Sequence, residues 1–269
     1  MRLGGIFLLS AVTLFLCFPL VEGFGAPAAS DPKALALMQA AAANFEKLKT
    51  VQADIGQVLT KGPSLQRFGG SYVASSPGRI HIQYTYPYIQ DVVSDGVQLW
   101  WYIPNSKKVW HLDDMKALFR MNEEESAGAA PFSTVGFENV DLKPKPDVYY
   151  TLEDSLWSKI TGTWKITFAG NKAAAGLKGT FWLDRKLGLP DKVEFLSEKG
   201  EVALRQTFED YIGIKNLFVP QKVMVEFPKN KFSLYVEYSN VRVNEAVQDS
   251  LFRFTTPQGV PVVPFPSLF

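Results

Sequence analysis

The clearest pattern of polar and apolar positions lies between Pro77 and Pro104. From Arg79 to Tyr84 the two kinds of residue alternate strictly, which is the period of a β-strand with two different faces. Further strands are predicted at 89–93 and 97–103, and the turn Ser94-Asp95-Gly96 joins them. This stretch therefore predicts strands that pair with one another through short connections.

Trp100 and Trp101 stand side by side in the last of these strands. Because successive side chains of a strand point to opposite faces, one indole lies on each face of the sheet. A strand with a large aromatic side chain on both faces is expected to be covered on both. We therefore expect some other part of the chain to pack on each side of this strand.

An amphipathic helix is predicted ahead of the strands, from about Ser30 to Lys49. Asp31 can cap its N-terminus, and Pro32 suits the first helical position because its missing N–H is not needed there. The apolar stripe of this helix is expected to cover a sheet. The residues that recur at three- and four-residue steps are Leu35, Met38, Ala42, Phe45 and Leu48.

Short alternating segments separated by tight turns follow along most of the chain. They predict an antiparallel meander that curls into an open or a closed barrel. Gly69-Gly70 would permit a bend or bulge that helps the sheet curl. The predicted strands are 51–60, 66–74, 109–111, 159–168, 176–184, 192–196, 202–211, 221–227 and 232–243.

The segment 112–137 departs from the strand period and predicts a short apolar helix, a loop rich in Gly and Ala, and a second apolar patch. Met and Phe side chains suit adaptable apolar contacts, and the small residues of the loop allow movement. Two interpretations are open. The segment is a lid over the sheet, or it is an ordinary helix packed against it.

The N-terminus has the charged, apolar and small-residue order of a secretory signal peptide, predicted at 1–28. Cys17, the only cysteine, is interpreted as an apolar residue of this signal, since Leu16 does not suit lipoprotein processing. The mature chain, 29–269, then holds no cysteine and no disulfide framework. Its length suits one large β domain or two small ones, and we expect a single domain.

Composition narrows the function. The chain is 46% hydrophobic and 13% aromatic, which is more bulky apolar material than a plain core needs. The alternative is an ordinary well-packed β protein, because strands favour aromatic residues. Its net charge of +1, from 28 basic and 27 acidic residues, argues against a nucleic-acid binder. Only His81 and His111 could act as imidazole bases, and we expect His81 to be a solvated side chain. No catalytic motif, metal site or cofactor site is predicted.

Several of these segments resemble the periplasmic outer-membrane lipoprotein carriers, the LolA-like family. The motifs are Pro77-Gly78-Arg79 through Tyr84, Pro87-Tyr88, Val93-Ser94-Asp95-Gly96 with Leu99, Trp100 and Tyr102, and the C-terminal element Asp249–Val260. The resemblance implies an α+β fold. In such a fold a curled antiparallel sheet forms an incomplete, half-open β-barrel, with an N-terminal helix and short lid helices over its concave face.

The resemblance implies a monomeric periplasmic carrier that is not an enzyme. It would accept acylated lipoproteins from an inner-membrane lipoprotein-releasing transporter and pass them to an outer-membrane receptor. We expect their acyl chains to occupy an apolar cavity. Because the pattern does not tell which strand face is concave, Trp100 and Tyr102 are alternatives to the expected lining, which is Ile80, Ile82, Leu99, Trp101, Met115, Phe119 and Phe132.

One position departs from the family. Many carriers have an arginine directly before the conserved proline, where it holds the lid closed, and Ser76 takes this place here. A hydroxyl offers one donor where a guanidinium offers five. The lid latch is therefore expected to be weaker at Ser76, or to be made elsewhere by Arg79 or Arg120.

Two other classes of function stay open at this stage. A periplasmic sensor on the same scaffold would bind lipoproteins or glycolipids and signal to a membrane partner. An enzyme acting on lipids or cell-wall material would depend on His81 or His111.

Overall fold

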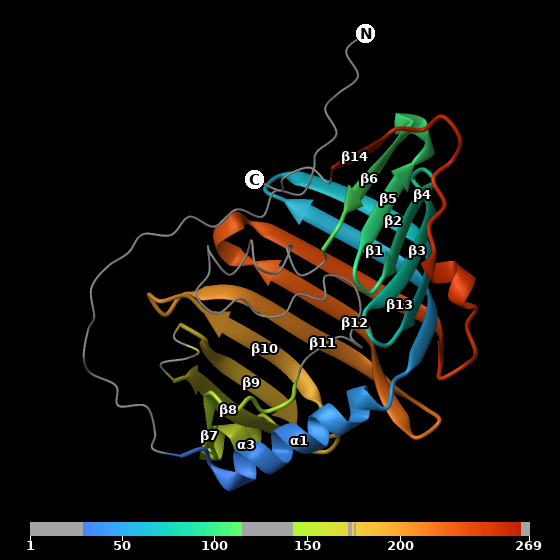
Figure 1. Cartoon of the computed structure of the whole chain (residues 1–269). Coiled ribbons are helices and arrows are strands. Elements are labelled where there is room, and N and C mark those ends of the chain that lie inside the picture. Colours follow the sequence, from blue (N-terminus) through green and yellow to red (C-terminus); the bar gives the residue numbers. More distant parts are fainter. Residues whose placement is uncertain (1–28, 115–141, 172–173, 175, 265–269) are drawn as a thin grey trace.

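The structure is a computed structural model of the whole chain, and it describes every residue except 1–28, 115–141, 172–173, 175 and 265–269 (Figure 1). Within the described part, fourteen strands form one continuous sheet, in the order β14-β6-β5-β4-β3-β2-β1-β13-β12-β11-β10-β9-β8-β7. The strands pair antiparallel except for β14, which runs parallel to β6. The sheet curls strongly without closing, so the predicted half-open barrel with an N-terminal helix is confirmed.

The elements have the following bounds. The helices are α1 (Pro32–Glu46) and α3 (Leu156–Ile160), and the short 3-10 turns are η1 (Pro104–Ser106), η4 (Pro228–Asn230) and η5 (Asp249–Phe252). The strands are β1 (Thr50–Lys61), β2 (Ser64–Ser75), β3 (Arg79–Tyr86), β4 (Gln90–Asp95), β5 (Leu99–Ile103), β6 (Lys108–Leu112), β7 (Val148–Glu153), β8 (Thr163–Gly170), β9 (Lys178–Asp184), β10 (Pro190–Leu196), β11 (Val202–Ile214), β12 (Leu217–Phe227), β13 (Phe232–Val243) and β14 (Val262–Pro264).

Three details differ from the sequence prediction. The strand predicted to begin at Lys159 begins at Thr163, because residues 156–160 form α3 instead. Leu112 ends β6, and Asp113 and Asp114 are not helical, so no helix opens there; residues 115–137 of the predicted lid lie outside the described residues. Strands β7 and β14 were not predicted: β7 alternates between buried and more exposed positions, whereas β14 has only three residues and is defined by its pairing with β6.

Helix α1 is held at both ends. The Asp31 side chain caps it by accepting hydrogen bonds from the N–H groups of Lys33 and Ala34. The Asp31 backbone N–H donates to the carbonyl of Tyr150 in β7 at 2.8 Å. Near the other end, the Asn44 side chain donates to the Phe218 carbonyl at 2.7 Å and accepts from the Phe218 N–H at 3.0 Å. The helix therefore extends from β7 to the β11–β12 hairpin.

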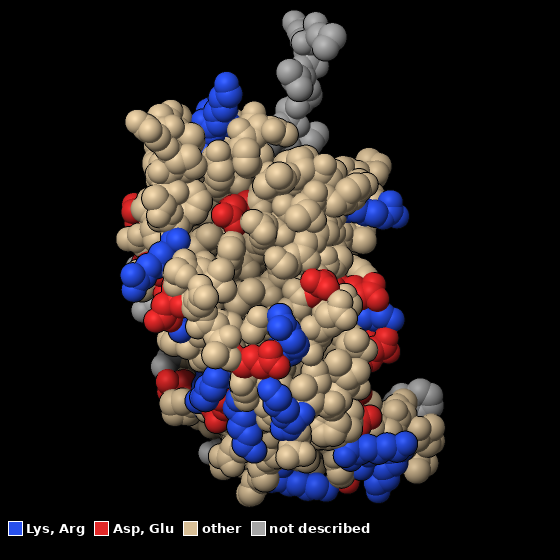
Figure 2. Space-filling view, turned by 90° about the vertical axis from the view of Figure 1, so that its right-hand side faces the viewer, with Lys and Arg blue, Asp and Glu red and all other residues tan. Residues whose placement is uncertain are grey.

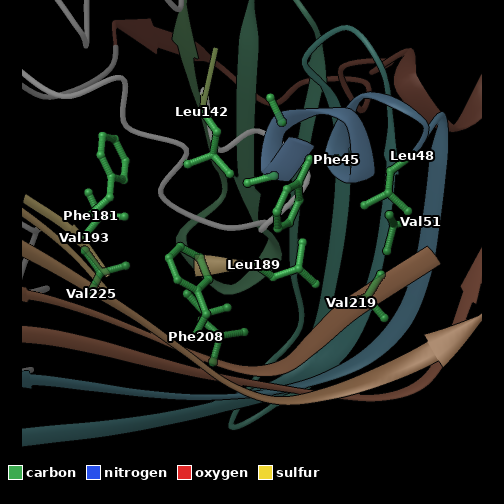
Figure 3. Close-up of a cluster of buried hydrophobic side chains, with 14 of the residues drawn as sticks. Phe45, Leu48, Val51, Leu142, Phe181, Leu189, Val193, Phe208, Val219 and Val225 are labelled. Atoms are coloured by element: carbon green, nitrogen blue, oxygen red, sulfur yellow. The ribbon is translucent and has the colours of Figure 1, made fainter. Parts of the chain in front are cut away.

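The main core lies between α1 and the inner, concave face of the sheet. Figure 3 shows Phe45 and Leu48 from the α1 side above side chains that come from the strands and from the β9–β10 connection. Every second residue of the strands contributes, as expected for a sheet with one buried face. Fully buried examples are Val51, Tyr72, Ile166, Leu183, Val193, Val219 and Tyr238.

A second apolar layer covers the outer face of β3–β6. Phe254 lies against Trp100 and Tyr102 with ring centroids 6.3 and 6.1 Å away, and Phe252 is 1% exposed. Trp101 points to the inner face, where its ring lies 5.2 Å from that of Trp110. Phe254 therefore covers the outer face of this strand, as expected. On the inner face Trp101 contacts the neighbouring strand β6, so a cover over that face stays a prediction.

The charged side chains are distributed without a large region of one sign on the face that Figure 2 shows. Lys and Arg are intermixed with Asp and Glu over its lower half, while its upper half is mostly uncharged. Several ion pairs join neighbouring strands, such as Arg205 with Glu194 at 2.8 Å and Lys222 with Asp210 at 2.6 Å. Such pairs on a surface add little to stability.

One carboxyl group makes stability depend on pH. Burial and, to a smaller extent, repulsion from Asp184 raise the pKa of Asp191 in β10 from its ordinary value of 3.8 to about 6. The folded state thus holds this proton more tightly than the unfolded chain. The contribution to folding is complete below about pH 4 and is lost as the pH rises through 6.

Asp191→Asn is therefore expected to raise the free energy of unfolding at pH 7.5 by about 1 kcal/mol, a value reduced for the partial exposure of the group. The gain should disappear at pH 4, where aspartic acid is already protonated. Urea unfolding at both pH values measures it, with the exposed Glu201→Gln as control. Equal gains in unfolding free energy at both pH values would contradict the raised pKa of Asp191.

Candidate functional site

The inner face of β3–β5 carries the four strand residues that the sequence proposes for the cavity. Ile82 and Trp101 lie in one row across the sheet, joined through Val92. Ile80 and Leu99 lie in the next row, joined through Ser94. All four residues therefore share one face.

This face is the concave one, continuous with the main core. Ile82 pairs with the fully buried Tyr72 of β2, and Ile80 pairs with Ala74. Ile82 is only 3% exposed, whereas Ile80, Leu99 and Trp101 are partly buried. The alternatives Trp100 and Tyr102 face outward, onto Phe254. The partly buried side chains leave apolar surface along the inner face of these strands.

A small polar cluster, made of Gln57, Tyr84, Gln90 and Trp101, interrupts this apolar surface. The Tyr84 hydroxyl donates to Oε1 of Gln57 at 2.7 Å, and the Trp101 indole N–H donates to Oε1 of Gln90 at 3.0 Å. Burial raises the pKa of Tyr84 far above its usual value, against the smaller opposing effect of the Gln57 hydrogen bond. The phenol is therefore neutral and acts as a donor. Gln57 is 4% exposed and Gln90 2% exposed.

Sequence reasoning missed Gln57, Tyr84 and Gln90 as a group. A signal for Gln57 was present, because it continues the buried alternation of Val51, Ala53 and Ile55 in β1. A glutamine at a position of that period is a buried polar group that needs partners. Gln57 of β1 and Gln90 of β4 come together around Tyr84 only when the strands pair in the folded sheet, which a local pattern does not show.

The remaining residues proposed for the cavity and the latch lie outside the described residues: Met115, Phe119, Phe132 and Arg120. The hollow proposed beneath 112–137 involves these residues and stays a prediction. Leu142, which follows directly, is 1% exposed and belongs to the main core.

The two described latch candidates have different surroundings. Ser76 is exposed in the β2–β3 turn, where its N–H donates to the Lys49 carbonyl at 2.9 Å. Arg79 lies on the outer face: its guanidinium donates to Asp249 at 2.7 Å and to Ser75 at 2.8 Å, and it covers the ring of Phe252 at 4.8 Å. Arg79 therefore secures the C-terminal segment, on the face opposite to the proposed cavity.

Both histidines lie on the outer face. His81 pairs with Asp91 at 2.7 Å and is partly buried, so its interpretation as a solvated side chain is wrong. His111 stacks on Trp100, with the ring centroids 5.1 Å apart. Among the described residues, no hydroxyl or thiol is hydrogen-bonded to the His81 ring, whose partner is Asp91.

Two other features of the described part of the chain bear on a ligand site, namely its possible metal ligands and a surface depression. No group of three or more His, Cys, Asp or Glu side chains there is placed to hold a metal ion. A depression of about 230 Å³ lies over β1, β2 and β13, and its lining includes Gln52, Asp54, Ser71, Asn240 and Arg242. These polar side chains do not suit an acyl chain.

The family comparison matches the part of the chain that carries this site. Residues 46–151 match the family model of the outer membrane lipoprotein carrier protein LolA. This part of the chain is therefore similar to LolA. The matched range begins at the end of α1 and includes β1–β6, which hold the proposed strand residues and the polar cluster.

Two curated relatives carry the same description, outer-membrane lipoprotein carrier protein. The relative from Halorhodospira halophila is 22% identical over 227 residues, which cover 84% of each chain. The relative from Methylococcus capsulatus is 38% identical over 60 residues, which cover 22% of this chain and 29% of the relative. The LolA-like similarity in sequence thus extends beyond the range of the family model.

Solved structures share the fold. A LolA superfamily protein from Nitrosomonas europaea aligns with a TM-score of 0.53 at 14% identity, covering 82% of this chain and 97% of that one. A Vibrio parahaemolyticus domain described as an outer membrane lipoprotein-sorting protein domain aligns with a TM-score of 0.57 at 16% identity, covering 82% and 96%. At these identities the comparison establishes the fold alone, a LolA-like open barrel.

The helices also bear on whether the chain could span a membrane. In the described ranges, none of the helices has the length and apolar character needed to cross a bilayer.

Proposed function

We propose that this protein is a periplasmic carrier that binds the acyl chains of outer-membrane lipoproteins on the concave face of its sheet. The observation that carries the proposal is the set of partly buried apolar side chains on this face, Ile80, Leu99 and Trp101, within the LolA-like region. The carrier names of the relatives support the choice of cargo. In this proposal Met115, Phe119 and Phe132 complete the lining.

The energetics suit a carrier. Burial of an acyl chain yields about 0.8 kcal/mol per CH₂, so a long chain gains on the order of 10 kcal/mol before ordering costs. A bilayer offers the same chain a similar gain. A protein with such a face can therefore take up a lipid and release it again, provided that the donor and the acceptor favour each step.

The wider assignment follows from this function. Residues 29–269 act as one domain in the periplasm after removal of 1–28, and the partners are an inner-membrane lipoprotein-releasing transporter and an outer-membrane receptor. Uptake and release involve no bond making or breaking, so the protein is not an enzyme. The placement of both histidines away from the concave face supports this.

Residues 29–269, purified under mild conditions, are expected to carry acylated peptide or lipid that mass spectrometry detects. The delipidated protein should bind an apolar fluorescent probe, and a triacylated lipopeptide should displace it, whereas the same peptide without acyl chains should not. Absence of both bound lipid and probe binding would overturn the proposal.

A further inference from the structure

The polar cluster on the concave face holds two hydrogen-bond donors that have no acceptor. Nε2 of Gln57 and Nε2 of Gln90 are buried and make no hydrogen bond in this structure. The oxygen of each carboxamide is already engaged, by Tyr84 and by Trp101 respectively. A buried amide N–H₂ without a partner is unfavourable and rare in folded proteins.

The orientation of Gln90 is set by chemistry. An indole N–H can only donate, so the atom that it contacts must be the carboxamide oxygen, and the nitrogen is left as the free donor. The phenol of Tyr84 imposes the same orientation on Gln57 as long as its hydroxyl donates, as it does here. The two partners thus turn both N–H₂ groups away from the hydrogen bonds already made.

The position of these donors relates them to the proposed cargo. Gln90 lies on the inner face of β4, directly opposite Tyr84 of β3, and two residues before Val92 in the row of Ile82 and Trp101. Gln57 lies on the inner face of β1 and reaches the same tyrosine. The donors therefore adjoin the apolar rows where acyl chains are proposed to lie.

An acyl chain carries one polar group that needs such a donor. Its ester or amide carbonyl oxygen loses water when the chain enters an apolar site, and this loss is unfavourable unless a hydrogen bond replaces it. The unpaired carboxamide donors of the protein have the complementary need. An alkyl chain joined through an ether lacks this carbonyl oxygen and keeps only the ether oxygen of the linkage.

We propose that Gln57 and Gln90 bind the carbonyl oxygens that link acyl chains to the head of the cargo, so that the carrier selects acyl chains over plain alkyl chains. This inference rests on the proposed function and specifies the chemical group recognised. Tyr84 and Trp101 act as positioning residues, because each holds a carboxamide by its oxygen.

Two lipopeptides with the same peptide and chain length test the proposal. One carries two chains on glycerol through esters, the other through ethers, and both have a free N-terminus. Displacement of the fluorescent probe from the delipidated protein gives their affinities. We expect the ester form to bind about tenfold more tightly, the effect of one or two net hydrogen bonds.

Gln90→Met keeps the side-chain volume and removes the donor, so it should reduce the preference to threefold or less, and Gln57→Met should also reduce it. Gln52→Met is the matched control, because Gln52 lies in β1 like Gln57 but accepts a hydrogen bond from Arg242 at 3.0 Å outside the cluster. The Gln52→Met variant should prefer the ester over the ether lipopeptide by the same factor as the original protein.

The comparison of the two lipids in the original protein needs no variant, so poor folding of a variant does not obscure the result. Equal affinity for the ester and the ether would overturn the carbonyl contact while leaving the carrier function intact. If neither lipid bound, the proposed function would fail, and this inference with it.

Discussion

Ile80→Asp is expected to weaken lipopeptide binding about 100-fold, which corresponds to about 2.7 kcal/mol. Ile80 lies partly buried on the concave face of β3, in the row of Leu99. A bound acyl chain would remove water from a carboxylate at this position and supply no hydrogen bond, which strongly disfavours the charged group. The short aspartate side chain has little freedom to reach solvent past the lipid.

Probe displacement by a triacylated lipopeptide measures this loss. The matched control is Thr85→Asp, which introduces the same charge at an exposed position of the same strand. Its affinity should stay within about twofold of the original, as expected for a surface substitution. If Ile80→Asp bound as tightly as the control, the acyl chain would not lie along this face of β3. A thermal unfolding curve of each variant verifies that both are folded.

The second large effect concerns the curl of the sheet. Gly70→Ala is expected to lower the free energy of unfolding by about 3 kcal/mol. A Cβ at this position would overlap the backbone carbonyl of Gln83 and lie 2.7 Å from Cα of Tyr84. Both atoms belong to the main chain of β3, so no side-chain rotation relieves the contact. The pairing of β2 with β3 shifts register at Gly69/Gly70.

Gly56→Ala provides the control, because a Cβ at Gly56 would meet no atom within 4 Å. Gly56 of β1 pairs with Gly69 of β2, which directly precedes Gly70. Gly56 and Gly70 therefore lie in the same part of the sheet. Urea denaturation should show a change within about 0.5 kcal/mol for this variant. Equal loss in the two variants would mean that flexibility, and not the close approach at the register shift, explains the glycine at position 70.

The alternation of residues predicted which side chains of neighbouring strands share a face. It placed Ile80 and Ile82 on one face of their strand, and Leu99 and Trp101 on one face of theirs, and the structure joins the two pairs. It also suggested the bend at Gly69-Gly70, which the register shift confirms. These features follow from neighbours in the chain, since a strand repeats every two residues.

Two contacts on the outer face were not predicted. Arg79 is paired with Asp249, and His81 is paired with Asp91 and so is not the solvated side chain that was expected. Asp249 is 170 residues away from Arg79 in the chain, and a local pattern cannot show pairing at such a separation. Asp91 is only 10 residues from His81, but the contact depends on the pairing of β3 with β4. Another difference is local: residues 156–160 form helix α3, so β8 begins at Thr163 and not at Lys159 as predicted.

The sequence by itself determined the alternating strands, the capped N-terminal helix and the surplus of apolar side chains that suggested a lipid. Only the tertiary structure decided which strand face is concave, because this depends on where α1 and the C-terminal segment pack. It also decided that Gln57 and Gln90 meet the same apolar surface around Tyr84. Periodicity acts over a few residues, whereas curvature and buried polar contacts arise from strands that are distant in the chain and become neighbours only in the folded sheet.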